Sequence, residues 1–290
     1  MKKVLVPTNY AEDTLNTVQY AADFSRAVQA QMVILHVLEI YAQAAYANTA
    51  TGYYAPEMST EYVQEHKGQA EQQMETFVKH LPEDVQGMIA RTIVEHGLLA
   101  ENAHGLEKIE GISHIFLTGH ESEDFLDRLF FNNYRNVIEN CKSPVWIIDP
   151  GVVFRPFKKI VYATDYHPED LTALQQLLKL ARIFNARVDI LHIGNEKAAD
   201  KKINGTTFQQ ALKTLGGNQH FNFKRLESGG VSSAIVRYAE EQQADLLVML
   251  KENKGFFEQL FSSSSTEKVR RKSRLPLMIF NSEALSDKDE

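Results

Sequence analysis

Cysteine is nearly absent from this sequence, because Cys141 is the single example among 290 residues. One thiol can neither close an intramolecular disulfide nor supply a thiolate metal cluster, and we expect it to be a small packed side chain rather than a nucleophile. The ten histidines show no His-x-x-x-His spacing, so we predict no metal site. The sequence contains neither a Gly-x-Ser-x-Gly motif nor a Gly-Lys-Ser/Thr motif, and we assign no catalytic residue.

The sequence also has no excess of positive charge. Its 31 lysines and arginines are outnumbered by 38 aspartates and glutamates, which gives a formal net charge of −7. A nucleic-acid binder normally presents a basic face and anionic membranes attract basic segments, so we expect neither as a partner. No apolar run approaches the roughly 18 residues that a membrane span needs. A soluble cytoplasmic protein is therefore expected.

What the sequence does contain is an internal repeat. Residues 2–10, KKVLVPTNY, return as residues 158–166, KKIVYATDY, at an offset of 156. The match continues without a gap through Ile-Leu-His, which ends at His36 in the first copy and at His192 in the second. The chain is longer than the roughly 100–200 residues of a usual single domain, so the repeat predicts two copies of one domain.

The two copies differ in length. Further along the chain Glu95 corresponds to Glu227, an offset of 132, so the first copy holds 24 more residues than the second. We place this insert at about residues 39–62, a run that is rich in tyrosine and has no clean period. The predicted domains are residues 1–150, with the insert, and residues 157–290.

Each copy alternates apolar strand-like runs with amphipathic helical segments. Residues 4–6, 32–37, 188–193 and 246–249 are short continuous apolar runs, as buried parallel strands are. The segments between them carry apolar residues at helical spacing. The prediction is an α/β fold of two tandem, doubly wound, five-stranded parallel sheets, in which ligands bind beyond the carboxyl ends of the strands.

Several segments resemble the universal stress protein family: residues 4–9 (VLVPTN), the Ile-Leu-His-Val run at 34–37, and residues 264–269 (SSTEKV) before Pro276. The resemblance extends over both halves. It implies an adenine-nucleotide α-hydrolase-like fold in each half. It also implies that paired domains join through their last strands, here residues 144–148 and 276–280.

Members of that family either bind ATP or do not, and the resemblance defines what a binder needs. Binders carry an Asp after the first strand, and a Gly-x2-Gly-x9-Gly-Ser/Thr loop whose amides surround the phosphates. In the first half Asn9 replaces the Asp, and Gly119 is one residue out of place. We therefore expect this half not to bind ATP. The loop positions are Thr118, Glu121, Phe131 and Asn132.

The second half keeps more of the pattern. Asp165 follows Thr164, but Leu250, Asn253 and Ser263 stand where glycines would be. Lys251 and Lys254 in the same loop could neutralise an anion. The serine run has two readings, a helix N-cap or a degenerate phosphate site. On the second reading, the nucleotide-binding residues are Thr164, Asp165, Ile193, Ser263, Ser264 and Ser265.

Three further features have alternatives that the sequence leaves open. His36 and His192 either line a cleft or are structural histidines satisfied by the backbone, and we favour the structural role. The apolar runs 125–131 and 256–261 either fill the space of a nucleotide or form a contact surface. The tyrosine-rich insert is either a lid or partner-binding loop, or an ordinary surface loop.

These observations favour a non-catalytic stress-response or regulatory protein with degenerate nucleotide sites and no required cofactor. Its two halves would pair within the chain, with an unidentified protein partner and with homodimer formation left open. The alternative is an ATP- or AMP-binding protein, or a slow ATPase, that uses the second half only. A third hypothesis places another small ligand in the first half, beside Asn9 and the insert.

Overall fold

The computed structural model describes residues 2–38, 60–119, 132–193, 205–216, 221–227, 231–251, 275–282 and 285. The predicted insert at 39–62 falls mostly outside these ranges, and only its last residues, 60–62, are placed, in a helix. The apolar runs 125–131 and 256–261 also lie outside the described residues. What the sequence suggested for them stays a prediction.

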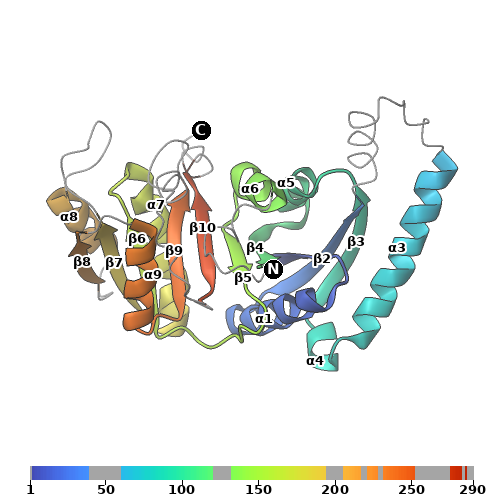
Figure 1. Ribbon diagram of the computed structural model, residues 1–290, viewed down its shortest axis with the longest axis horizontal. Coiled ribbons are helices and arrows are strands. Elements are labelled where there is room, and N and C mark those ends of the chain that lie inside the picture. The colour runs from blue at the N-terminus through green and yellow to red at the C-terminus, as the bar shows by residue number, and fades with distance from the viewer. Residues whose placement is uncertain are drawn as a thin grey trace.

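The first half alternates strands and helices as the sequence predicts (Figure 1). Its strands all run parallel to one another. The elements are β1 (Lys3–Pro7), α1 (Glu12–Val28), β2 (Gln31–Leu38), α3 (Thr60–His80), α4 (Glu83–Gln86), β3 (Ile89–His96), α5 (Leu99–Glu110), β4 (Ile112–Thr118), α6 (Asn132–Asn140) and β5 (Val145–Ile148).

The second half repeats this order, again with all of its strands parallel. The elements are β6 (Lys159–Thr164), α7 (Pro168–Phe184), β7 (Arg187–Ile193), α8 (Gly205–Gly216), β8 (Phe221–Leu226), α9 (Val231–Glu241), β9 (Leu246–Lys251) and β10 (Leu277–Asn281). The predicted α/β class, with two tandem doubly wound parallel sheets, is confirmed.

The two five-stranded sheets join into one sheet of ten strands, in the order β3-β2-β1-β4-β5-β10-β9-β6-β7-β8. The join is the antiparallel pairing of β5 with β10, in which Trp146 lies opposite Met278. These are the two last strands that the family resemblance singled out. One edge strand of each half is thereby paired, which removes an exposed row of backbone donors and acceptors, while β3 and β8 form the two edges of the joined sheet.

Helices cover both faces of the sheet, and strand residues alternate between two hydrophobic cores. Val4 and Val6 pack into the core beneath α1, α3, α4, α7 and α8, whereas Leu5 packs into the core beneath α5, α6 and α9. This alternation is the period-two geometry of a strand that is buried on both faces. Both cores contain residues of both halves, so hydrophobic packing crosses the join.

The segment between β5 and β6 is packed rather than free. Phe157 is 1% exposed and stacks on Trp146 with ring centroids 6.0 Å apart. Phe154 contacts Tyr20 of the first half at 5.3 Å and Phe184 of the second half at 6.0 Å. The aromatic side chains of this connecting segment therefore contact both halves and hold them together.

Cys141 is buried directly after α6, and burial raises the pKa of its thiol, as does the nearby Glu107. A protonated, buried thiol is a poor nucleophile, in keeping with the packing role expected for it. Among the described residues, none of the helices is both long enough and apolar enough to cross a bilayer.

The continuous sheet predicts that the two halves unfold together. Trp146 is the single tryptophan and is fully buried at the join, so its fluorescence reports on the contact between the halves. We expect one cooperative transition in denaturant, with coincident midpoints for tryptophan fluorescence and far-ultraviolet circular dichroism. A fluorescence transition well separated from the loss of helix would contradict this expectation.

Candidate functional site

The carboxyl ends of β6 and β7 bring together three of the predicted nucleotide residues. Thr164 ends β6 and pairs with His192 of β7, next to Ile193, and Asp165 follows directly after the strand. Asp165 is 4% exposed. The other three predicted residues, Ser263, Ser264 and Ser265, lie outside the described residues, as does Lys254. The described part of this candidate site is thus the end that would face a nucleoside.

A buried carboxylate, which sequence reasoning missed, organises this end of the second half. Asp170 of α7 is 1% exposed. It accepts hydrogen bonds from Tyr162 Oη at 2.5 Å, Thr164 Oγ1 at 2.6 Å and the backbone N–H of His167 at 2.9 Å. Thr164 Oγ1 in turn accepts the N–H of Tyr166 at 2.9 Å. The Thr164 hydroxyl is therefore engaged with protein groups on both sides.

Burial raises the pKa of Asp170 well above its ordinary value of 3.8, to about 7. Hydrogen bonds from Thr164 and Tyr162 lower the pKa, and the neighbouring Asp165 raises it. The first half has Thr14 and Val6 at the positions 156 residues before Asp170 and Tyr162, so it has no such carboxylate. A buried carboxylate at this position is therefore particular to the second half.

Both halves carry the same tyrosine–histidine stack beside the first strand. Tyr10 stacks on His36 and Tyr166 on His192, each with ring centroids 4.3 Å apart. Both tyrosines have positive φ, 65° and 67°, a conformation that costs a non-glycine residue about 1–3 kcal/mol. The strain is kept in both copies, where the ring contacts offset it.

Each of these histidines is satisfied by the backbone. His36 Nδ1 lies 2.8 Å from the carbonyl oxygen of Thr8, and His192 Nδ1 lies 3.0 Å from that of Thr164. Burial lowers the pKa of His36, against the opposing effect of its backbone hydrogen bond. This geometry agrees with the structural role that the sequence favoured.

The corresponding place in the first half is occupied by protein groups. Asn9, which replaces the expected Asp, uses its Oδ1 to accept the N–H of Ala11 at 3.0 Å and the Thr14 hydroxyl at 3.1 Å. Asn9 thus forms a local turn at the start of α1, the usual role of asparagine before a helix. Its amide oxygen is already engaged with two donors.

Gly119 has a clear structural function in this half. A Cβ built on Gly119 would lie 2.1 Å from Asp149 Oδ1 and 3.1 Å from Asp149 Cα. The glycine therefore allows the Asp149 carboxylate to approach the backbone after β4. Asp149 is 7% exposed.

Tyr134 of α6 also contacts the end of β4, next to Gly119. Its hydroxyl donates to the carbonyl oxygen of Thr118, at the end of β4. Burial raises the pKa of Tyr134, and the nearby Asp13 carboxylate raises it further. The half-buried phenol of Tyr134 thus lies against the end of β4 and near the Asp13 carboxylate. No sequence pattern pointed to Tyr134, because its hydrogen bond with Thr118 joins residues 16 positions apart.

Lys251 does not lie in a loop, as the sequence suggested, but is the last residue of β9. Its Nζ is 2.9 Å from Glu139 Oε1, on α6 of the first half. Burial would raise the pKa of Glu139, but hydrogen bonds from Lys251 and Arg135 outweigh it and lower the pKa. The Lys251 cation is therefore engaged across the join and is not poised over a phosphate.

We expect Gly119→Ala to destabilise the protein by about 1–3 kcal/mol, because the new methyl group would clash with Asp149. Denaturant unfolding of the purified variant measures the change. Gly105→Ala on α5 is the matched control, since nothing lies within 4 Å of its Cβ position. A Gly119→Ala protein as stable as the wild type would show that the glycine is not required by this contact.

The titration of Asp170 predicts a pH-dependent stability. Because its pKa is raised in the folded state, its contribution is fully present below about pH 4 and is lost as the pH rises towards 7. The free energy of unfolding of Asp170→Asn, relative to the wild type, should therefore rise between pH 4 and 7. Urea unfolding at pH 4.5, 5.5, 6.5 and 7.5 tests this. A difference that stays constant over this range would mean that Asp170 does not titrate there.

Comparison with known proteins gives one family and a common fold. The model of the universal stress protein family matches residues 1–149 and 156–281. A universal stress protein from Archaeoglobus fulgidus DSM 4304 superimposes with a TM-score of 0.65 at 19% identity, covering 96% of each chain. A putative universal stress protein from Pseudomonas aeruginosa UCBPP-PA14 does so with a TM-score of 0.52 at 13% identity, covering 98% of this chain and 95% of that chain.

The cytoplasmic domain of a prokaryotic cation chloride cotransporter has the same arrangement, with a TM-score of 0.51 at 14% identity and 98% of each chain covered. At such identities the likenesses establish the fold alone. No curated protein matches the sequence. The family model, in contrast, matches both halves of the ten-stranded sheet, and the chain therefore belongs to the universal stress protein family, with two such domains in tandem.

Proposed function

We propose that this chain is a non-catalytic regulatory protein of the stress response, in which the first domain binds no nucleotide. The observation that carries the proposal is the contact of Asp149 with Gly119. A phosphate-binding loop needs exposed amides where the backbone approaches the anion, and here a carboxylate occupies that approach. No cofactor is required for this function.

The energetics support the same conclusion. A phosphate group brought beside Asp149 and Asp13 would meet two carboxylates, and each like-charge contact at about 4 Å costs on the order of 1–4 kcal/mol. It would also have to displace the half-buried Tyr134 hydroxyl from the carbonyl oxygen of Thr118. Such losses exceed what the remaining helix terminus contributes to anion binding.

The second candidate function is nucleotide binding, or slow ATP hydrolysis, by the second domain only. It is favoured by Asp165 and Ile193, which lie at adjoining strand ends beside the Thr164 backbone. Against it, the Thr164 hydroxyl donates to Asp170, and Lys251 is paired with Glu139. Nucleotide would have to bind through Asp165, Ile193, the backbone and the serines 263–265, without the Thr164 hydroxyl or Lys251.

A regulatory protein without chemistry acts through contacts, and the paired halves supply a broad surface for them. The tyrosine-rich insert is our candidate contact for an unidentified protein partner, since tyrosine is enriched at interfaces. Whether two chains also associate is a separate question that sedimentation of the purified protein answers.

Isothermal titration with ATP and magnesium tests the proposal directly. We expect no binding heat at high micromolar protein. Binding near one equivalent, with a dissociation constant below about 100 μM (roughly −5.5 kcal/mol), would instead support the second candidate. Binding of two equivalents would contradict the proposal that the first domain binds no nucleotide.

Paired variants identify the domain responsible for any binding. Asp165→Ala should abolish binding if the second domain holds the nucleotide, and Asn9→Ala, the equivalent change in the first domain, should leave it unchanged. The reverse pattern would show that the first domain is the site after all.

A further inference from the structure

A hollow lies at the edge of the second domain opposite to the site described above. It measures about 420 Å³, within the range of small-molecule sites, and is lined by Lys159, Arg187, Asp189, Phe221 and Asn222. Three of these residues, Lys159, Arg187 and Phe221, are the first residues of β6, β7 and β8. The hollow therefore lies at the amino ends of the strands, away from Asp165 and Ile193 at their carboxyl ends.

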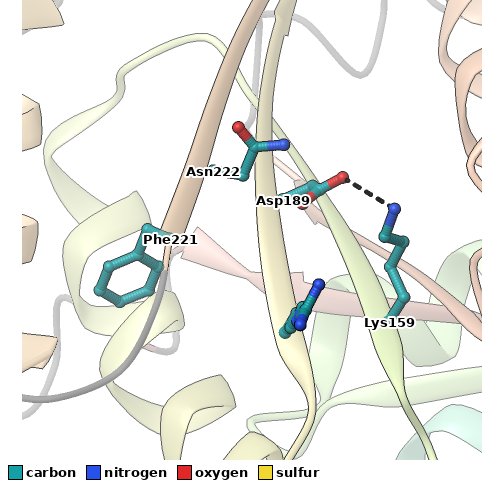
Figure 2. A pocket seen from close by; sticks show the side chains of 5 residues that line it. Lys159, Asp189, Phe221 and Asn222 are labelled. Atoms are coloured by element: carbon teal, nitrogen blue, oxygen red, sulfur yellow. Dashed lines mark ion pairs between the residues drawn. The ribbon is translucent and has the colours of Figure 1, made fainter.

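Asp189 is an unusual residue for its position. It is 2% exposed within β7, and the residue 156 positions earlier in the first domain is Val33, which is 0% exposed. An ionised carboxylate in a core position destabilises the fold unless it is paired. Here Tyr238 Oη donates to Asp189 Oδ2 at 3.1 Å, and Lys159 Nζ lies 3.7 Å from the same oxygen (Figure 2).

The first domain neutralises its equivalent edge differently. There Lys3 Nζ lies 2.6 Å from Glu110 Oε2, and Arg91 contacts the other oxygen of Glu110, so one carboxylate holds both cations. The residue 132 positions after Glu110 is Gln242, which is neutral and accepts a hydrogen bond from Lys159 Nζ at 3.0 Å. The carboxylate that pairs with the lysine is thus at the end of helix α5 in the first domain (Glu110) and inside strand β7 in the second (Asp189).

Arg187 has no charged counterpart in the first domain, where the residue 156 positions earlier is the neutral Gln31. Arg187 is exposed and pairs in strand register with Lys159, so two cations stand side by side on neighbouring strands. Like charges in such positions repel each other. Within the part of the chain that the structure describes, Arg187 forms no ion pair, whereas the Asp189 carboxylate already serves Tyr238 and Lys159.

Asn222 completes the hollow. It lies beside Asp189 in register on β8, and its side chain is exposed. Figure 2 shows the amide of Asn222 on the same side of the strands as Asp189, with Phe221 directed away from it. The amide can both donate to and accept from the polar part of a ligand that an arginine holds by its charge.

We propose that this hollow binds a small organic oxyanion, with its carboxylate or phosphate group on Arg187 and Lys159 and its neutral part against Asn222. The planar guanidinium fork of Arg187 matches either group in bidentate geometry. The inference is independent of nucleotide binding, because it uses the opposite edge of the sheet.

Isothermal titration of the full chain with succinate, citrate, inorganic phosphate and glucose 6-phosphate, at constant ionic strength in chloride, tests the inference. We expect at least one of these probes to bind with a stoichiometry of one. Arg187→Gln should weaken that binding about tenfold or more, since it removes a charged hydrogen-bonding group. Lys213→Gln, which removes an exposed cation from α8 outside the hollow, should leave it unchanged.

The probes also identify the source of the oxyanion. Binding by the carboxylates alone assigns an organic acid, and binding by the phosphates alone assigns a phosphorylated metabolite. The inference is overturned if none of the four probes binds. It is also overturned if binding is the same in Arg187→Gln as in the wild type, because the anion would then lie elsewhere.

Discussion

The antiparallel pairing of β5 with β10 is the contact on which the rest of the structure depends. It converts two five-stranded sheets into one sheet of ten and lets both hydrophobic cores run through the join. Trp146 lies at this contact, between Phe116 and Phe157, so the strands and the connecting segment are held by one aromatic cluster. Without this pairing, each half would expose a strand edge and an apolar surface.

The two halves share one structural frame and differ in the side chains around it. The tyrosine–histidine stacks and their backbone hydrogen bonds are the same in both copies, which marks them as parts of the frame. The polar side chains around them differ. The first copy packs Asp149 and Tyr134 around the end of β4, and the second buries Asp170 beside the carboxyl end of β6 and Asp189 near the amino end of β7. The two copies thus share this backbone geometry and differ in the charged side chains around it.

Much of the fold could be predicted, because repetition and hydrophobic period are local properties of the sequence. The register in which neighbouring strands pair could not be predicted in this way. Glu95 and Glu227 match in the sequence, yet Val37 pairs with Glu95 while its equivalent, Ile193, pairs with Leu226. A register irregularity between β2 and β3, which the sequence does not mark, accounts for the shift by one residue.

The candidate site was less predictable for a related reason. Thr164, Asp165 and Ile193 were found because they adjoin strand ends, whereas Asp170 acts through its hydrogen bonds with Tyr162 and Thr164. These hydrogen bonds depend on how α7 packs against β6. The ion pair of Lys251 with Glu139 joins residues that are 112 positions apart, and no local sequence pattern predicts such a contact.

The antiparallel join also sets the direction of the strands in the two halves. All strands of the first half run one way and all strands of the second half run the other way. The carboxyl-terminal edge of one half therefore lies on the same rim of the sheet as the amino-terminal edge of the other. One rim therefore holds the buried Asp149 and the hollow around Arg187, while the opposite rim holds the buried Asp165 and the ion pair of Lys3 with Glu110. The molecule thus offers two chemically distinct rims, despite being built from two copies of one domain.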